Sequence, residues 1–281
     1  MAADLHCHTT MSDGSDSPEF VVRLAKNIGL SALAITDHDC YAGSFGAAQL
    51  GEKIGIRVIE GVECSCRDVG RGHKVHILCY NCRYPEAIEA VLQKANQARA
   101  KAAAEMIDKV SKLYPITEEM VMDSAGKGGF VGKQHIMLAL MKAGYADEMF
   151  GDLFKELFSA KHGSCFVPIQ HTDMLETVDV LHQSGGVIVL AHPSVYGSIA
   201  SLKDLIKAGI HGVEINHPRN KPQDIAILQE AVNRHSLLVT GGTDFHGYFA
   251  ERSRFSPLGQ YTANDEQLER LLEKSAELWQ R

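Results

Sequence analysis

The sequence lacks any apolar run approaching the ~20 residues that a membrane-spanning helix needs, and no signal peptide is visible at its start. It also lacks an excess of basic residues, since the net charge is −7 and the isoelectric point is near 6.0. Such a chain exerts no long-range attraction on polyanions, so we expect neither a stable nucleic-acid complex nor a membrane partner. These features predict a cytoplasmic protein and leave its oligomeric state open.

Cysteine is present, but not in the pattern of a disulfide framework. The seven cysteines are an odd number in a chain of 281 residues, which indicates a reducing compartment. If Glu63 points inward from its strand, its neighbour Cys64 points outward. We therefore favour small apolar residues in the outer layer of the fold over a structural zinc knuckle. The cysteines that such a knuckle would use are Cys64, Cys66, Cys79 and Cys82.

Strand and helix patterns alternate over most of the first 80 residues and again after residue 172. Apolar runs bounded by turn residues predict strands, and helical periodicity fills the intervals. The predicted strands are 3–9, 32–36, 57–64, 74–80, 187–191, 212–216 and 237–240. The predicted helices in these parts are 18–28, 42–54, 173–183, 201–208, 223–234 and 264–278. This alternation favours the α/β class, as a distorted (β/α)7-type, TIM-like barrel.

The segment between these two parts has no convincing strand. Helical patterns cover 86–113, restart at Thr117 and continue over 132–143 and 147–159, with a glycine-rich loop at 126–129. We therefore predict a barrel made of residues 1–84 and 166–281. Residues 85–165 form a small all-α domain inserted into it, which we expect to cap the active site.

The first predicted strand contains a His-x-His pair, His6 and His8, whose side chains point the same way because strand side chains alternate. Compatible groups recur at or just beyond the ends of later strands, where the mouth of a barrel gathers them into one site. These groups are Asp13, Asp37, His38, Asp39, Glu63, His76, His192, Asp244 and His246. The pattern predicts a polynuclear metal site in which Asp37 and Asp39 orient His38 and do not bind metal.

The motifs that carry this pattern occur in a characteristic order. They are Asp4-Leu5-His6-Cys7-His8-Thr9, Ser12-Asp13-Gly14, Thr36-Asp37-His38-Asp39, Gly61-Val62-Glu63, His76, Ala191-His192-Pro193 and Thr243-Asp244-Phe245-His246. Together they span almost the whole chain, and they resemble the polymerase and histidinol phosphatase (PHP) family of metal-dependent phosphoesterases. With its helical insertion, the chain is similar to the branch of that family that acts on nucleotides and small phosphoesters.

The resemblance implies a centre of three divalent ions, with Mn²⁺ favoured and Fe²⁺ or Zn²⁺ as alternatives. His6, His8 and Asp244 would hold the first ion, Asp13, His38 and His246 the second, and His76 and His192 the third, with Glu63 bridging the first and third. A hydroxide bridging the first and third ions would attack phosphorus, which makes Asp244 part of the catalytic machinery.

Four further residues are expected to contact the substrate, namely Lys133, His135, His217 and Arg219. Residues 132–135 begin a predicted helix, whose N-terminus with a cation suits an anion. The resembling branch usually reads Gly-Arg-Pro-His there, whereas this chain reads Gly-Lys-Gln-His and so offers a point charge in place of a bidentate fork. His217 is the candidate general acid, and Arg219 a candidate phosphate contact.

The expected function is metal-dependent hydrolysis of a small phosphorylated metabolite or nucleotide, a phosphomonoester such as a 3′,5′-bisphosphonucleotide. Small cyclic phosphodiesters and the 5′ ends of short RNA are alternative substrates. The insertion lacks an aromatic-rich stacking segment, which favours a small substrate over a long nucleic acid. An amidohydrolase and a non-catalytic metal-binding module are less favoured. The positions of Asp13 and Glu63, the complete ligand set and the absence of an obvious carbamylated lysine argue against them.

Overall fold

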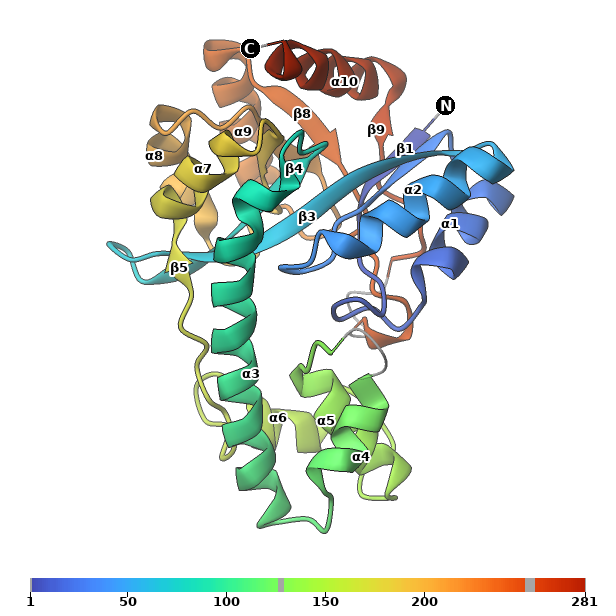
Figure 1. Cartoon of the computed structure of the whole chain (residues 1–281). Helices are drawn as coiled ribbons and strands as arrows, with labels where there is room; N and C mark the ends of the chain where they lie inside the picture. Colours follow the sequence, from blue (N-terminus) through green and yellow to red (C-terminus); the bar gives the residue numbers. More distant parts are fainter. Residues whose placement is uncertain (1, 126–128, 251–255, 281) are drawn as a thin grey trace.

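The structure, a computed structural model, describes residues 2–125, 129–250 and 256–280 (Figure 1). In these ranges nine strands form one sheet, in the order β8-β7-β6-β4-β3-β2-β1-β9 with β5 paired to β3. The strands are β1 (Ala2–Cys7), β2 (Ala32–Ile35), β3 (Arg57–Asp68), β4 (His73–Tyr80), β5 (Thr172–Asp173), β6 (Val187–Leu190), β7 (Gly212–Asn216), β8 (Leu238–Gly241) and β9 (Ala263–Asn264). The sheet curls into a nearly closed barrel, so the predicted TIM-like α/β fold is confirmed.

Helices follow most of the strands and also build the insertion. They are α1 (Pro18–Asn27), α2 (Ala42–Ile54), α3 (Glu89–Ser111), α4 (Glu118–Ala125), α5 (Lys133–Lys142), α6 (Asp152–Phe158), α7 (Met174–Gln183), α8 (Leu202–Lys207), α9 (Pro222–His235) and α10 (Asp265–Trp279). Ser17 begins α1 as predicted, because its hydroxyl accepts a hydrogen bond from Phe20 N and Pro18 occupies the first turn. No helix in the described ranges is long and apolar enough to cross a membrane.

The first strand and the segment after β8 bring the two edges of the barrel together. Cys7 forms an isolated parallel bridge with Phe245. His8 N donates to Phe245 O at 2.8 Å, and Phe245 N donates to His6 O at 3.2 Å. The pairing of β1 with β2 shifts register between Asp4 and Cys7, and such a bulge re-aims side chains next to active sites. Barrel closure and the placement of His6 and His8 therefore depend on the same backbone.

The interior of the barrel is apolar at one end and polar at the other. An apolar cluster joins the inward side chains of the sheet to Leu268 and Leu271 of α10, the helix drawn at the top of Figure 1. The predicted metal ligands gather at the opposite end of the strands. Apolar packing thus stabilises one half of the barrel, and the other half is free to hold polar groups.

Strands 57–64 and 74–80, predicted to follow one another without a helix between them, form an antiparallel pair, which was not predicted from the sequence. β3 runs to Asp68, four residues beyond the predicted end, and pairs antiparallel with β4, which is also antiparallel to β6. Only a tight turn separates β3 and β4, closed by a hydrogen bond from Gly72 N to Asp68 O at 2.7 Å. A parallel pair needs a crossover of a dozen or more residues, so this connection forces a hairpin.

The insertion has a hydrophobic cluster of its own, formed by α3 to α6 and the segment that follows them. Phe249, from the loop after β8, packs against this cluster, so the insertion meets the barrel beside the loop that carries Asp244 and His246. The domain boundary at 85–165 stays a prediction. Most of the glycine-rich loop predicted at 126–129 lies outside the described residues.

The seven cysteines are free thiols. Those considered for a zinc knuckle belong to the hydrophobic cluster between the sheet and its outer helices. Cys79 Sγ and Cys82 Sγ lie 3.5 Å apart. Burial raises the pKa of the Cys64 and Cys66 thiols well above the usual value. Both thiols are therefore neutral and pack as small apolar groups. In the described ranges, no group of side chains able to hold a metal includes a cysteine.

Candidate metal centre

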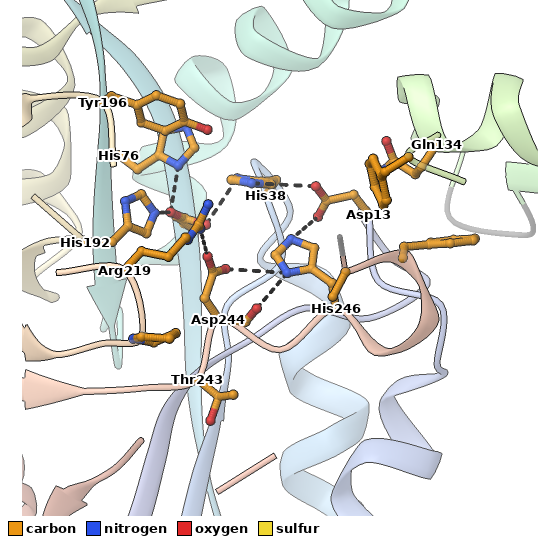
Figure 2. A pocket seen from close by; sticks show the side chains of 15 residues that line it. Asp13, His38, His76, Gln134, His192, Tyr196, Arg219, Thr243, Asp244 and His246 are labelled. Atoms are coloured by element: carbon orange, nitrogen blue, oxygen red, sulfur yellow. Dashed lines mark hydrogen bonds and ion pairs between the residues drawn. The ribbon is translucent and has the colours of Figure 1, made fainter. Parts of the chain in front are cut away.

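Strand ends and the loops after them bring the nine predicted ligands to one mouth of the barrel. In Figure 2, His76 and His192 lie on one side of a cavity, Asp13 and His246 lie on the other, and His38 lies between them. β1, β3 and β4 supply His6, Glu63 and His76, and the segments after β1, β2, β6 and β8 supply the remaining six. Six of the nine thus follow the end of a strand, as predicted for most of them, whereas Glu63 lies inside β3 and His76 lies near the start of the antiparallel β4.

Three overlapping groups within this set could each hold an ion, because their ligand atoms lie within 4.8 Å of one another. The groups are His8 with Asp13, His38 and His246; His6 with His8, Glu63 and Asp244; and His38 with Glu63 and His76. The first two resemble the predicted sites for the second and first ions. The third contains His38 in place of the predicted His192.

Glu63 lies at the centre of the cluster. Its Oε2 is 3.1 Å from both His6 Nε2 and His8 Nε2, and its Oε1 is 2.8 Å from His76 Nδ1 and 2.7 Å from His192 Nε2. One carboxylate oxygen therefore faces each of two histidine pairs. A carboxylate that bridges two ions needs this arrangement. The contact of Oε1 with His192 also places His192 beside the group formed by His38, Glu63 and His76.

Several of these atoms are buried and make no hydrogen bond. They are His6 Nε2, both ring nitrogens of His8, Glu63 Oε2 and His192 Nδ1. A buried polar group without a partner costs about 1–3 kcal/mol, so several in one cluster need an explanation. Ligation of a cation supplies one. Neutral imidazoles with carboxylates suit Mn²⁺, Fe²⁺ or Zn²⁺, so the donor set fits the predicted ions.

Carboxylates dominate the electrostatics of this centre. Burial lowers the pKa of His6, but the charges of Glu214, Glu63 and Asp244 outweigh burial and raise it well above the usual value. Burial likewise lowers the pKa of His8, and its contacts with Asp244 and Glu63 raise it to about 10. Burial raises the pKa of Glu63, yet the surrounding histidines bring it well below its ordinary value. Without a metal, protons on His6 and His8 balance part of the carboxylate charge, so a cation competes with these protons.

Glu214 is a buried residue of this site that the sequence reasoning missed. Its Oε1 accepts from His6 Nδ1 at 3.0 Å, and its Oε2 accepts from His192 N at 2.8 Å. The first bond fixes the His6 tautomer and turns Nε2 toward Glu63, as carboxylates behind metal-binding histidines do. A sequence signal existed, since Glu214 is a charged residue inside the otherwise apolar run of β7.

Two aspartates hold the loops that carry ligands. Asp4 accepts from Thr243 N at 2.9 Å and from the Thr243 hydroxyl, and so fastens the segment before Asp244. Asp37 accepts from Thr9 N, from the Thr9 hydroxyl and from the Ser12 hydroxyl, and so holds the turn that carries Asp13. The prediction that Asp37 orients His38 is therefore wrong.

Asp39 does not orient His38 either. Its Oδ1 accepts from Ser65 N at 2.8 Å, and its Oδ2 pairs with Arg99 of the insertion at 2.5 Å. The His38 ring instead contacts Glu63 Oε2, 3.3 Å from His38 Nδ1, and the Ser65 hydroxyl, 3.5 Å from the same nitrogen. Asp39 therefore connects the barrel to α3.

Two predicted ligands have backbone angles that favour glycine. His192 has φ 24° and Asp244 has φ 55°. Such angles cost a non-glycine residue about 1–3 kcal/mol and persist where surrounding contacts fix them. Glu214 holds the N–H of His192, and Arg219 holds the Asp244 carboxylate. The strained angles thus aim both side chains at the cluster.

The candidate general acid His217 is buried behind Asp244 and does not line the cavity. Its Nδ1 accepts from Arg219 N at 3.2 Å, and its Nε2 faces Asp244 Oδ2 at 3.5 Å. Arg219 lines the cavity, and its guanidinium donates to the same carboxylate oxygen. Asp244 Oδ1 is left to face His6 and His8.

Neither Lys133 nor His135 lines the cavity, although the intervening Gln134 does. Lys133 Nζ donates to Phe158 O at 3.2 Å and lies 4.4 Å from the centre of the Phe166 ring. His135 Nδ1 accepts from Gly132 N at 3.0 Å and so caps α5. Burial lowers the pKa of Lys133 to about 8 and that of His135 to about 4.

The cavity above the cluster has a volume of about 260 Å³. Besides the ligands and Arg219, its walls include Gln134 and Phe150 from the insertion and Tyr196 and Phe249 from barrel loops. These four residues were not assigned to the site from the sequence: Gln134 stood out only as a departure from the Gly-Arg-Pro-His pattern, and the other three belong to no motif. Their place depends on how the insertion meets the barrel mouth.

Comparison with known families gives a direct match. The PHP domain model matches residues 4–203. A solved structure from Bifidobacterium adolescentis, described as a metal-dependent phosphoesterase, superposes with a TM-score of 0.89 at 31% identity and covers 99% of this chain and 98% of that one. This chain belongs to the PHP family, and it is a metal-dependent hydrolase of phosphoester bonds.

Relatives in the family carry different substrate names. A phosphoribosyl 1,2-cyclic phosphate 1,2-diphosphodiesterase from Eggerthella lenta is 36% identical, over 89% of this chain and 95% of the relative. The 5′-3′ exoribonuclease Rnm of Escherichia coli is 34% identical, over 86% and 84%. A 3′,5′-nucleoside bisphosphate phosphatase from Chromobacterium violaceum is 28% identical, over 86% of both chains.

Proposed function

We propose that this enzyme hydrolyses a phosphomonoester of a small phosphorylated metabolite, such as a 3′,5′-bisphosphonucleotide. Support comes mainly from one observation: the nine side chains predicted as ligands, several with buried unpartnered atoms, converge beneath a cavity of about 260 Å³. A cavity of this size suits a phosphorylated pentose or mononucleotide better than a polymer. The bisphosphate phosphatase from Chromobacterium violaceum agrees with this proposal.

We assign three divalent ions, with Mn²⁺ as the leading candidate, to the ligands in the predicted allocation. His6, His8 and Asp244 would hold the first, Asp13, His38 and His246 the second, and His76 and His192 the third, with Glu63 shared between the first and third. When bound, such ions lower the pKa of water and neutralise charge on phosphoryl oxygens.

The protein's own groups position these ligands and the substrate. Glu214 keeps His6 in the tautomer that presents Nε2, and His217 and Arg219 hold Oδ2 of Asp244 so that Oδ1 faces the cluster. Arg219 lines the cavity, and a guanidinium has further N–H groups that can donate hydrogen bonds to a phosphoryl oxygen. We therefore propose His217 as a positioning residue for Asp244 and keep Arg219 as the phosphate contact.

The test is release of inorganic phosphate by the Mn²⁺-loaded protein across nucleoside bisphosphates, sugar phosphates and amino-alcohol phosphates. Asp13→Asn and His192→Asn should abolish turnover while the thermal transition stays cooperative. Asp108→Asn, which alters an exposed pair with Lys112, is the matched control. Full activity in both ligand variants would refute the assignment.

A cyclic phosphodiester is the second candidate, because the Eggerthella lenta relative is named for one and covers most of this chain. The same panel should include small cyclic phosphates, with the products identified by phosphorus NMR. A 5′-phosphorylated short RNA completes the panel, in view of the Escherichia coli relative. Turnover of only one of the three substrate classes (phosphomonoesters, cyclic phosphates or 5′-phosphorylated RNA) identifies the substrate class.

A further inference from the structure

The hairpin of β3 and β4 extends beyond the metal ligands that it carries, and its continuation is basic. Glu63 on β3 and His76 on β4 face the cavity. Side chains two residues apart on a strand share a face, so Arg67 and Lys74 face the same side as Glu63 and His76. The register agrees, because Ser65 is opposite His76 and Arg67 is opposite Lys74.

A third chain segment adds His171 to this surface. Thr172 of β5 is in parallel register with Cys66, whose side chain lies in the outer cluster. His171 directly precedes Thr172, so the alternation of side chains turns it to the inner face with Arg67 and Lys74. Both ring nitrogens of His171 are buried and have no hydrogen-bond partner. An imidazole without hydrogen-bond partners at this place indicates a ligand or water that forms a hydrogen bond with it, as donor or as acceptor.

The cations on this surface outnumber the carboxylates paired with them. Asp39 pairs with Arg99, which also donates to Ser65 Oγ at 3.1 Å. In the described part of the chain, Lys74 has no carboxylate partner, and Arg67 donates only to the carbonyl of Gly72 at 3.0 Å. Burial and the neighbouring Lys74, Arg99, His76 and Arg67 charges lower the pKa of His171 to about 3, which agrees with an excess of positive charge. Such an excess attracts an anion.

Tyr196 connects this basic surface to the cavity. Its ring centre lies 4.9 Å from that of His76 and 6.0 Å from that of His192, and Lys74 Nζ lies 5.6 Å from the Tyr196 ring centre. Tyr196 lines the cavity, and Lys74 lies just beyond it with its side chain exposed. Lys74 is two positions from His76, so its backbone is ~6.6 Å further along the strand. A substrate group bound by Lys74 can therefore belong to the same small molecule as a phosphoryl group at the metal ligands.

We propose that Lys74 and His171 form a second anion subsite, which binds a distal phosphate of the substrate while the reacting phosphoryl group lies at the metal ligands. The substrate class is then a molecule with two phosphoryl groups joined through a pentose-sized spacer. This inference rests on the proposed function and sharpens it, since it accounts for a preference among phosphoesters through two residues outside the metal centre.

Kinetics with substrates of one and two phosphates test the subsite. For a nucleoside 3′,5′-bisphosphate, Lys74→Met should raise KM by about tenfold or more, as expected for loss of one charge-assisted contact, with kcat little changed. For p-nitrophenyl phosphate, which has no distal phosphate, both constants should stay at the wild-type values. His171→Asn should change the bisphosphate constants in the same direction, and Lys74→Arg should restore most of the affinity.

Lys94→Met is the matched control, because Lys94 is an exposed α3 residue that pairs with Glu176 away from the cavity. Equal effects of Lys74→Met on the two substrates, or no effect on either, would overturn the subsite. If the wild-type protein hydrolyses no phosphoester at all, the proposed function fails. Binding of the bisphosphate by calorimetry then decides the subsite alone, which stands if Lys74→Met weakens binding and falls if it does not.

Discussion

Glu214 offers the sharpest test of how this centre is built. It contacts no substrate-facing surface, yet its two oxygens hold His6 Nδ1 at 3.0 Å and His192 N at 2.8 Å. Glu214→Gln keeps the shape of the side chain but replaces one acceptor oxygen by an amide that only donates. Either the Nδ1–H group of His6 or the backbone N–H of His192 then faces the NH₂ group of the glutamine, which is also a donor. If the His6 group faces it, the His6 ring must move its proton to Nε2, the nitrogen that faces Glu63 and the first ion.

The size of the effect follows from the bond that is lost. A hydrogen bond to a charged group contributes about 1.5–3 kcal/mol, and each 1.4 kcal/mol is a factor of about ten in an equilibrium constant. We therefore expect Glu214→Gln to weaken Mn²⁺ binding by about 10–100-fold, the range seen when residues behind metal ligands are changed. Turnover at saturating Mn²⁺ should recover most of the wild-type rate, because the nine ligands remain.

The assay is phosphate release as a function of free Mn²⁺, with metal affinity measured in parallel by titration calorimetry. Glu230→Gln, which alters an exposed pair with Arg234 on α9, controls for the change in charge. Wild-type Mn²⁺ affinity in a folded Glu214→Gln protein would show that Glu214 does not position His6 for the metal. A loss of rate that saturating Mn²⁺ does not repair would show instead that Glu214 acts on more than ligand geometry.

Three further predictions concern protons, packing and acid stability. The pKa of His8 is raised to about 10 without metal, so Mn²⁺ must displace a proton from His8 when it binds. The Mn²⁺ affinity should therefore fall as the pH is lowered, and calorimetry in buffers of different ionisation enthalpy should detect the released proton. A Mn²⁺ affinity that does not vary with pH would contradict this. A Cβ at Gly242 would lie 2.3 Å from His6 Cβ, so Gly242→Ala should lower Tm and Mn²⁺ affinity, whereas Gly46→Ala in open space should leave both intact or raise Tm slightly. The pKa of His135 falls from 6.5 unfolded to about 4 folded, so its contribution to stability is present above about pH 6.5 and is lost as the pH falls toward 4. The acid loss of unfolding free energy in denaturant titrations should therefore be shallower in His135→Gln, and equal slopes would contradict the assignment.

The side chains that the sequence predicts as ligands lie together in the structure, because the signals for their placement are local. Most of the predicted ligands follow or end a short apolar strand pattern, and parallel strands of a barrel deliver their ends to one mouth; His6 lies within its strand, and His76 lies near the start of the antiparallel β4. His6 and His8, for example, need only strand alternation and one bulge to face the cluster. The antiparallel hairpin was missed because apolar alternation is the same in parallel and antiparallel strands, and the few residues between Asp68 and His73 carry the information instead.

The roles of residues around the ligands were harder to read. Asp37 and Asp39 neighbour His38 in the chain, and sequence proximity suggested that they orient it. In the structure their partners are instead Thr9 and Ser12 for Asp37, and Ser65 and Arg99 for Asp39. Such partners come from other strands and from the insertion, and no local pattern encodes them.

The class of chemistry could be inferred from the residues alone, since clustered histidine and carboxylate side chains suit divalent ions and phosphoester hydrolysis wherever the fold gathers them. The groups that support this chemistry, and the walls around it, depend on the folded chain. Glu214 reaches His6 across 208 residues of chain, and His217 lies behind Asp244 instead of in the cavity. The register of β3 with β4 and with β5 turns Lys74 and His171 to the same face of the sheet. These contacts depend on long-range packing, which hydrophobic periodicity constrains only in outline.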